Sequence, residues 1–131
     1  MKRRAGRCLV ESGDAVFVRV GLGAREAALG AGDPAVRAGL DPSCLSWLHR
    51  REVAVFCGDC VDQIASGYDR LAMPLHEIGF SAMGLCFVDN TDMEALLVAV
   101  SRSRTGEFLL CAAPLRIPGG TWSPVNPLAV F

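Results

Sequence analysis

Chemically active side chains gather near the middle of the chain. Cys57 and Cys60 are separated by two residues in the stretch VAVFCGDCVDQ, residues 53–63. Such a pair could bind zinc, exchange thiols or have no chemical role. A structural zinc site needs four ligands, and the sequence has one CxxC pair and two histidines, His49 and His76, that form no spaced pair. The pair is therefore a weak signal for zinc or redox chemistry, and a structural role is favoured.

Carboxylates follow two apolar runs. Asp59 and Asp62 come just after VAVF, residues 53–56, and Asp89 follows GLCFV. Polar groups at the carboxyl ends of strands in α/β sheets meet ligands, but aspartates there also cap turns. The spacing leaves both roles open for Asp59 and Asp62. For Asp89 it favours capping of the next helix over binding a metal or a basic side chain.

Two further polar residues lie in apolar surroundings. His76 lies in AMPLHEIGF, where a lone histidine is more often a hydrogen-bonded packing residue than a ligand. Arg19 interrupts the apolar run VFVRVG. A buried guanidinium needs a partner, so we expect Arg19 either to bind a carboxylate such as Asp59 or to face water. These residues alone give no complete catalytic set.

Strands and helices alternate along the chain. Apolar runs predict strands over 15–20, 53–56 and 84–89, and a longer strand over 107–117, followed by a loop and a short final strand. Alternation of strands with helices predicts an α/β fold.

Helix signals fall between these strands. Asp41 and Pro42 predict a helix start, and another helix is expected over about 74–82. Thr91 and Glu94 have the spacing of a capping box before a helix over 93–102, with Leu96, Leu97 and Val100 facing inward. Between 24 and 40, three glycines and a proline are expected to break any long helix.

Composition restricts the class of protein. The 131 residues, 51% of them hydrophobic, suit one domain or less, and the formal net charge of −1 disfavours nucleic acid as a partner. No run is long enough for a membrane span, and the basic start lacks the apolar stretch of a secretory signal. With six cysteines expected as reduced thiols, these features predict a cytoplasmic protein.

Four stretches carry a resemblance to a known family. ESGDAVFVRVGLG is similar to "xxGDxVLxRTGW", and HRREVAVFCGDCVD to "xxxVxxxGxDTxSxD". PLHEIGFSAMGLCFVDNTDMEAL is similar to "xxHxxLLxxGxxxxExLxNLxxL", and LLCAAPLRIPGGTWSPVNPLAVF to "xxxPLKIxGxxGSPVRAxA". Together they resemble the cyclase family of metal-dependent hydrolases, which includes bacterial kynurenine formamidase and isatin hydrolase.

The resemblance implies a fold and an activity. The fold is a swivelling β/β/α domain with a mostly buried mixed sheet flanked by helices. The implied activity is arylformamidase-like: zinc or manganese activates water against a formamide, lactam or cyclic amide, as in tryptophan catabolism.

The resemblance also assigns residues. His76 matches the family histidine and Asp89, 13 residues later, the family glutamate, so both are expected to be catalytic. His76 would meet the metal only through bound water. Asp59 matches the fixed aspartate of the second stretch, with Cys60 in place of threonine, and Arg19 lies in the first stretch. Both are expected to support the substrate site.

The sequence departs from the family in three places. It lacks the metal-binding motif HxGTHxDxPxH, so residues 1–131 are expected to form one incomplete domain, the C-terminal part of a longer protein that carries the main ligands. Asp89 is one methylene shorter than glutamate. Trp122 replaces a glycine and would be strained if that glycine has positive φ.

Two other functions remain open. The chain could be a non-catalytic, degenerate half-domain that forms homo-oligomers or pairs with a full-length relative, because a partial sheet leaves edges and apolar faces uncovered. A small redox or zinc module built on CGDC is the third alternative.

Overall fold

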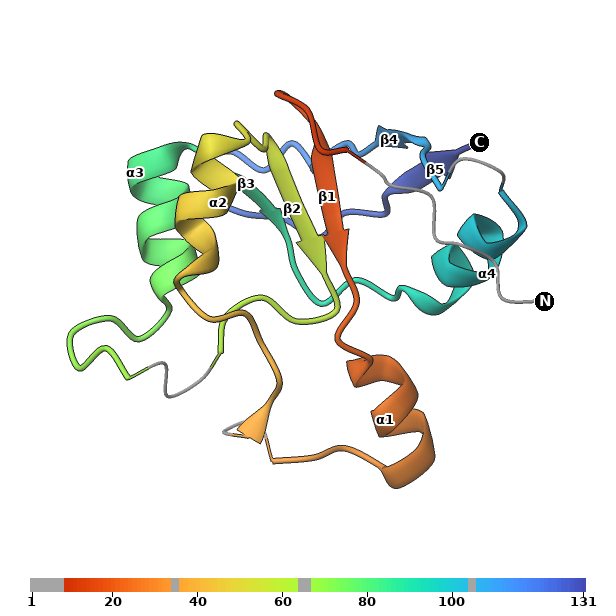
Figure 1. Cartoon of the computed structure of the whole chain (residues 1–131), viewed down its shortest axis with the longest axis horizontal. Coiled ribbons are helices and arrows are strands. Elements are labelled where there is room, and N and C mark those ends of the chain that lie inside the picture. The colour runs from red at the N-terminus through yellow and green to blue at the C-terminus, as the bar shows by residue number, and fades with distance from the viewer. Residues whose placement is uncertain (1–8, 34–35, 64–66, 104–105) are drawn as a thin grey trace. The chain divides into compact units, whose positions relative to one another are not determined.

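The computed structural model describes residues 9–33, 36–63, 67–103 and 106–131, which divide between two compact units (Figure 1). One unit is Leu9–Ala95, and the other contains the described residues from Leu96 to Phe131. The expectation of a single incomplete domain stays a prediction.

A parallel sheet is the centre of the first unit. Its strands are β1 (Ala15–Val18), β2 (Val55–Gly58) and β3 (Cys86–Val88), in the order β1-β2-β3. Phe17 and Val88 both pair with Cys57, so the three carboxyl ends lie at the same edge. The predicted α/β fold is therefore confirmed, and the strands of this sheet are all parallel.

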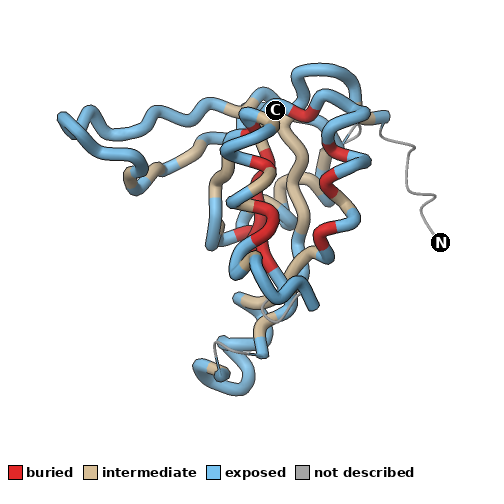
Figure 2. Tube along the Cα trace, turned by 90° about the vertical axis from the view of Figure 1, so that its left-hand side faces the viewer, coloured by how far each residue is buried: buried red, intermediate tan, exposed pale blue. Residues whose placement is uncertain are grey.

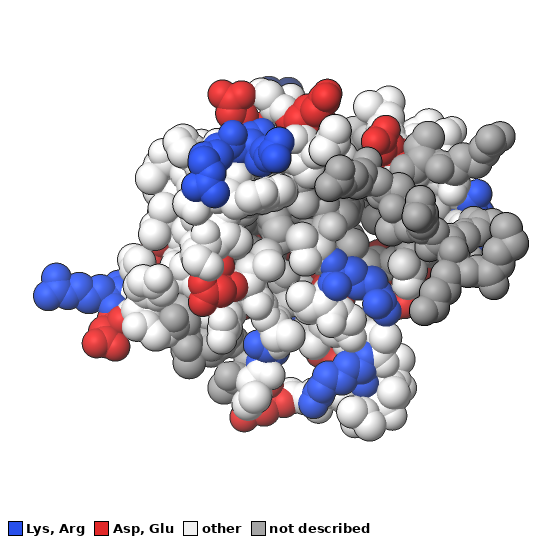
Figure 3. Space-filling view, viewed as in Figure 1, with Lys and Arg blue, Asp and Glu red and all other residues white. Residues whose placement is uncertain are grey.

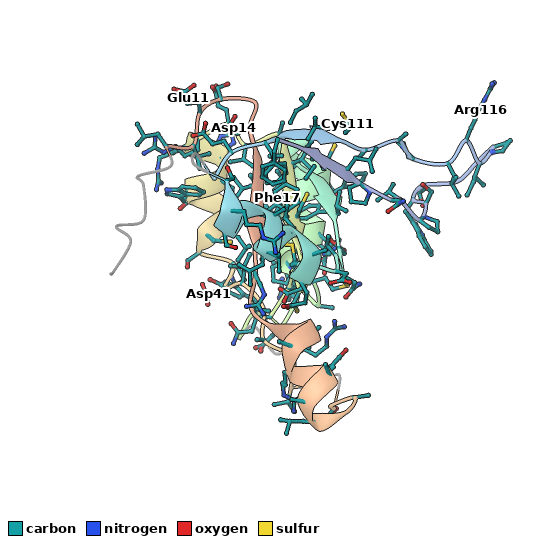
Figure 4. All side chains as sticks on the ribbon, turned by 90° about the vertical axis from the view of Figure 1, so that its right-hand side faces the viewer. Glu11, Asp14, Phe17, Asp41, Cys111 and Arg116 are labelled. Carbon is teal, nitrogen blue, oxygen red and sulfur yellow. The ribbon has the colours of Figure 1, made fainter. Side chains whose placement is uncertain are left out.

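A turn aligns β1 with the segment before β2. The carboxylate of Asp14 accepts a hydrogen bond from the Glu11 amide at 2.8 Å, and its carbonyl accepts one from the Ala54 amide at 3.0 Å (Figure 4). Gly13 donates to the carbonyl of Glu52 at 2.9 Å. Gly13 has φ of 88°, a conformation that glycine adopts at low cost.

Helical segments connect the strands. Asp41 accepts a hydrogen bond from the Ser43 amide just before α2 begins (Figure 4). The π-helix η2 leads directly into α3, so the predicted helix over 74–82 is confirmed. The helices are α1 (Leu22–Leu29), α2 (Cys44–Arg50), η2 (Leu75–Phe80), α3 (Ser81–Met83) and α4 (Glu94–Arg102).

The core of this unit lies between the sheet, α2 and η2. Figure 2 shows buried residues along the central strand and along helical segments beside it. Burying apolar side chains of this size stabilises the fold by about 1.5–3 kcal/mol each. The buried hydrophobic cluster consists of Leu45, Leu48, Val53, Phe56, Val61, Leu75 and Leu85.

The second unit contains a two-stranded antiparallel sheet. Its strands are β4 (Leu109–Cys111) and β5 (Leu128–Val130), and Phe108 packs against Phe131 at a centroid distance of 5.4 Å. The long loop between them carries Arg116 (Figure 4). None of the described residues of this unit is buried.

Several predicted elements were wrong in detail. The eight-residue helix α1 was not predicted, but it ends at Gly30, one of the glycines expected to break a long helix. The second strand begins two residues later than predicted. Of the strand predicted over 107–117, three residues form β4, because β5 supplies only three partners.

The predicted capping box does not form. Asp92 accepts the hydrogen bond from the Glu94 amide at 3.0 Å, and the Thr91 hydroxyl donates to the carbonyl of Val88. The carboxylate of Glu94 is bound by Arg19. Leu97, expected to face inward, is 46% exposed.

Candidate functional site

His76 lies between two carboxylates at the carboxyl edge of the parallel sheet. Its Nδ1 meets Oδ2 of Asp62, and its Nε2 meets Oδ2 of Asp89 at 2.6 Å. The Asp62 side chain is 6% exposed and that of Asp89 is 32% exposed. The array therefore runs from a buried carboxylate through the imidazole to a carboxylate that reaches solvent.

Packing fixes the imidazole ring. His76 lies on the π-helix η2, a rare element that often occurs at functional sites. The ring of Phe87 on β3 stacks on it at a centroid distance of 4.8 Å. Gly79 permits this approach, because a Cβ there would lie 2.8 Å from Cζ of Phe87.

Backbone contacts hold Asp62 in place. Its Oδ1 accepts a hydrogen bond from the Leu75 amide at 2.7 Å, which ties the carboxylate to the start of η2. The Leu40 amide donates to the carbonyl of Val61 at 2.8 Å, and Leu40 forms a parallel bridge with Asp62. Asp62 was noted in the sequence as a polar residue after a strand, but its contact with His76 was not predicted.

The two carboxylates set the charge of His76. Burial by itself lowers the pKa of this imidazole. The hydrogen bond to Asp62 and the charge of Asp89 outweigh burial, and the pKa is raised above its ordinary value. An imidazolium donates from both ring nitrogens, which satisfies both carboxylates.

Asp89 does not cap a helix as its spacing suggested. Its carboxylate contacts His76, and the residue after it, Asn90, has φ of 51°. The side-chain oxygen of Asn90 accepts a hydrogen bond from Nη2 of Arg37 at 2.9 Å. The bend after β3 is thus held by a side chain from another part of the chain and by the Thr91 amide, which donates to the carbonyl of Gly58 at 2.9 Å.

Asp59 and Arg19 do not pair with each other. Asp59 accepts hydrogen bonds from the amides of Val20, Gly21 and Leu22 at 2.8–2.9 Å, so it caps the turn that starts α1. This is the capping alternative of the sequence analysis.

Arg19 binds Glu94, with Nη2 2.7 Å and Nε 3.0 Å from Oε1. Neither side chain is buried: Arg19 is 30% exposed and Glu94 is 45% exposed. An ion pair of this exposure contributes at most about 1 kcal/mol.

A pocket of about 280 Å³ opens at the same edge of the sheet. It adjoins the array through Asn90, the neighbour of Asp89. Four carboxylates and one guanidinium line it, so its lining is predominantly negative. The lining residues are Leu22, Gly23, Glu26, Arg37, Asp59 and 90–94.

The cysteines of CGDC are buried. Cys57 is 0% and Cys60 is 5% exposed. Burial, with a smaller contribution from the charge of Asp89, raises the pKa of Cys57 to about 12, and burial also raises the pKa of Cys60. Thiols that stay protonated are poor nucleophiles and metal ligands, so the structure gives no support to the redox or zinc alternative.

A metal does not fit the described side chains as they stand. No group of three or more His, Cys, Asp or Glu residues within ranges 9–33, 36–63, 67–103 and 106–131 is arranged to hold one. Both nitrogens of His76 already contact carboxylates.

Two wider features bear on function. Lys, Arg, Asp and Glu side chains are interspersed on the face seen in Figure 3. Within the described part of the chain, no helix is long and apolar enough to cross a membrane.

Trp122 is not strained, because Glu52 and Asn90 are the described non-glycine residues with positive φ.

Comparison with known proteins places the fold. No protein-family model matches the sequence, and no curated protein matches it. A crystal structure described as that of a novel cyclase is similar, with a TM-score of 0.72 and 27% sequence identity. The match covers 94% of this chain and 41% of that chain, so this chain spans less than half of that structure. The chain therefore has a mixed α/β fold, with a parallel sheet, that is similar to the fold of a cyclase.

Proposed function

We propose that this chain is part of a metal-dependent hydrolase of the cyclase family that cleaves the C–N bond of a formamide, lactam or cyclic amide. The observation that carries the proposal is His76 held between Asp62 and Asp89 at the carboxyl edge of a sheet whose fold resembles a cyclase. Amide hydrolysis needs a proton taken from water and a proton given to the leaving nitrogen, and a positioned histidine and carboxylate can do both.

The three residues take different roles. Asp62, buried and bound to the start of η2, orients the imidazole and stabilises its positive charge. Asp89 is the most exposed of the three and accepts the proton of the attacking water. His76 lies behind it with both ring nitrogens on carboxylates, so it supplies the proton for the leaving nitrogen through Asp89.

The proposed metal is zinc or manganese. When bound, such an ion lowers the pKa of its water and polarises the substrate carbonyl. The described residues offer no ligand set, and we propose that the principal ligands come from polypeptide outside this sequence. We expect the purified chain alone to bind either ion weakly or not at all, and stoichiometric metal by elemental analysis would contradict this.

The charges that line the pocket indicate which substrate charge it would accept. Glu26, Asp59, Asp92 and Glu94 line it, and Arg37 is its one basic lining residue. This balance favours an amide that is uncharged or carries a cationic group over one with a net negative charge. The five described cysteines are free thiols, which suits the cytoplasmic location that we propose.

The proposal is tested by hydrolysis of N-formylkynurenine and isatin, with zinc or manganese, by the product of the gene including the DNA upstream of Met1. His76→Gln is expected to lower kcat at least about 100-fold. His49→Gln is the matched control, because His49 is exposed on α2 and outside the site. Equal activity in the two variants would refute the proposal.

An alternative, non-catalytic function is favoured by one observation. Leu109 pairs with Val130 and Cys111 with Leu128 across β4 and β5, which places all four on one face, and all four are exposed. A two-stranded sheet is marginally stable alone. We propose, as the alternative, that this face covers the same face of a second copy. Light scattering tests for a second copy of this chain, and co-purification tests for pairing with a full-length relative instead.

A further inference from the structure

Arg37 has an unusual hydrogen-bonding state. Its Nη2 donates to Oδ1 of Asn90 at 2.9 Å, but its Nε is buried and has no partner. Among the described residues, this is the one buried side-chain nitrogen or oxygen found without a partner. A buried donor without an acceptor destabilises a fold. The hydrogen bond between Arg37 and Asn90 therefore has either to outweigh this cost or to serve another purpose.

The partner of Arg37 lies at the bend of the chain after β3. Asn90 has φ of 51°, a conformation that asparagine tolerates better than most residues. The residue before it is Asp89, whose carboxylate meets Nε2 of His76 at 2.6 Å. A change in the backbone of Asn90 would turn this carboxylate away from the imidazole.

The segment that carries Arg37 also holds the other carboxylate. Leu40 is hydrogen-bonded to Val61 and Gln63 on either side of Asp62. Gly39 approaches so closely that a Cβ would lie 2.2 Å from the carbonyl oxygen of Asp62. Residues 37–40 thus contact the chain at both carboxylates that flank His76.

We propose that Arg37 is a positioning residue: through Asn90 it aims the Asp89 carboxylate at His76, while Leu40 in the same segment holds Asp62. Its place in catalysis rests on the proposed function. The contact between His76 and Asp89 can be measured without any enzyme assay. Failure of the positioning role is therefore distinguishable from failure of the proposed hydrolase function.

The test is NMR of the whole chain with labelled histidine, following solvent exchange of the Nε2 and Nδ1 protons of His76. In Arg37→Met, which keeps a similar length without donors, exchange at Nε2 is expected to speed up at least about tenfold. Exchange at Nδ1, toward buried Asp62, is expected to change little. Asn90→Gly, which tolerates positive φ but removes the acceptor, should give the same result.

Three further measurements separate positioning from other effects. Arg70→Met, in an exposed loop, should leave both protons unchanged. The denaturation midpoint of Arg37→Met should equal or exceed that of the original chain, because an unpartnered donor is removed. Arg37→Lys, which restores one charged donor, should recover part of the slow exchange.

If Arg37 acted only through its positive charge, its removal would change the exchange rate at Nε2 in the opposite direction. Removing a cation near Asp89 would strengthen its attraction for the imidazolium and slow exchange at Nε2. Slower or unchanged exchange at Nε2 in Arg37→Met would overturn the proposal. So would equal acceleration of both protons together with a lower denaturation midpoint, which would indicate a merely structural role.

Discussion

At the scale of single residues, the charge of His76 makes stability depend on pH. The carboxylates of Asp62 and Asp89 raise the pKa of His76 in the folded state. The resulting stabilisation is complete below the unfolded pKa of about 6.5 and is lost as pH rises through the folded pKa. We expect the free energy of unfolding to fall from pH 6 upward through that folded pKa. Urea denaturation of His76→Gln should lack this part of the pH dependence, and an identical slope in both proteins would contradict the account.

The charge of the pocket gives a second residue-scale prediction. Glu26 lines the pocket and Glu77 does not. Removing a negative charge there should raise affinity for an anion by roughly threefold. Glu26→Gln should therefore strengthen binding of a carboxylate-substituted isatin, measured by calorimetry, and leave binding of isatin unchanged. Glu77→Gln is the control, and a similar gain in it would argue against the pocket.

Single residues also show what the sequence could predict. His76 and Asp89 were assigned by resemblance to family motifs, and the structure brings them together. Asp62 was not paired with His76, because strand spacing does not say which aspartate after β2 turns toward η2. The partner of Arg19 lies 75 residues away, and no local pattern identifies it.

At the scale of elements, the close packing of residues 37–40 against the backbone of Asp62 can be tested by substitution. An alanine Cβ at position 39 would overlap the backbone of Asp62, so Gly39→Ala should destabilise the chain by about 1–3 kcal/mol. Gly23→Ala is the control: it lies in α1 with nothing within 4 Å, and should stabilise slightly. Chemical denaturation measures both variants. An unchanged free energy of unfolding in Gly39→Ala would show that residues 37–40 are not packed as described.

Elements were predictable where local patterns decide them. Apolar runs located β1 and β3, and apolar spacing located α2 with Leu45 and Leu48 buried. Helix α1 was missed because its start depends on Asp59, which caps it from a distant part of the chain. The length of β4 depends on the short strand it pairs with, which an apolar run alone does not reveal.

At the scale of the whole molecule, exposed apolar side chains give a prediction about assembly. The face formed by Leu109, Cys111, Leu128 and Val130 is exposed, and Trp122 nearby in sequence is 83% exposed. If this face covers a second copy, the mass measured by light scattering should rise with concentration. Leu109→Lys with Val130→Lys should lower it, whereas Ala112→Lys should not. A monomer at all concentrations would exclude the pairing.

The similarity to a cyclase extends over 94% of this chain, and we propose that Asp89 and His76 handle protons in amide hydrolysis. The most direct test is kcat for N-formylkynurenine or isatin in the proposed longer protein, comparing Asp89→Asn with Asp69→Asn, an exposed loop residue. We expect kcat to fall at least about 100-fold in Asp89→Asn and to stay unchanged in Asp69→Asn. Activity of Asp89→Asn within a few-fold of the original protein would contradict it.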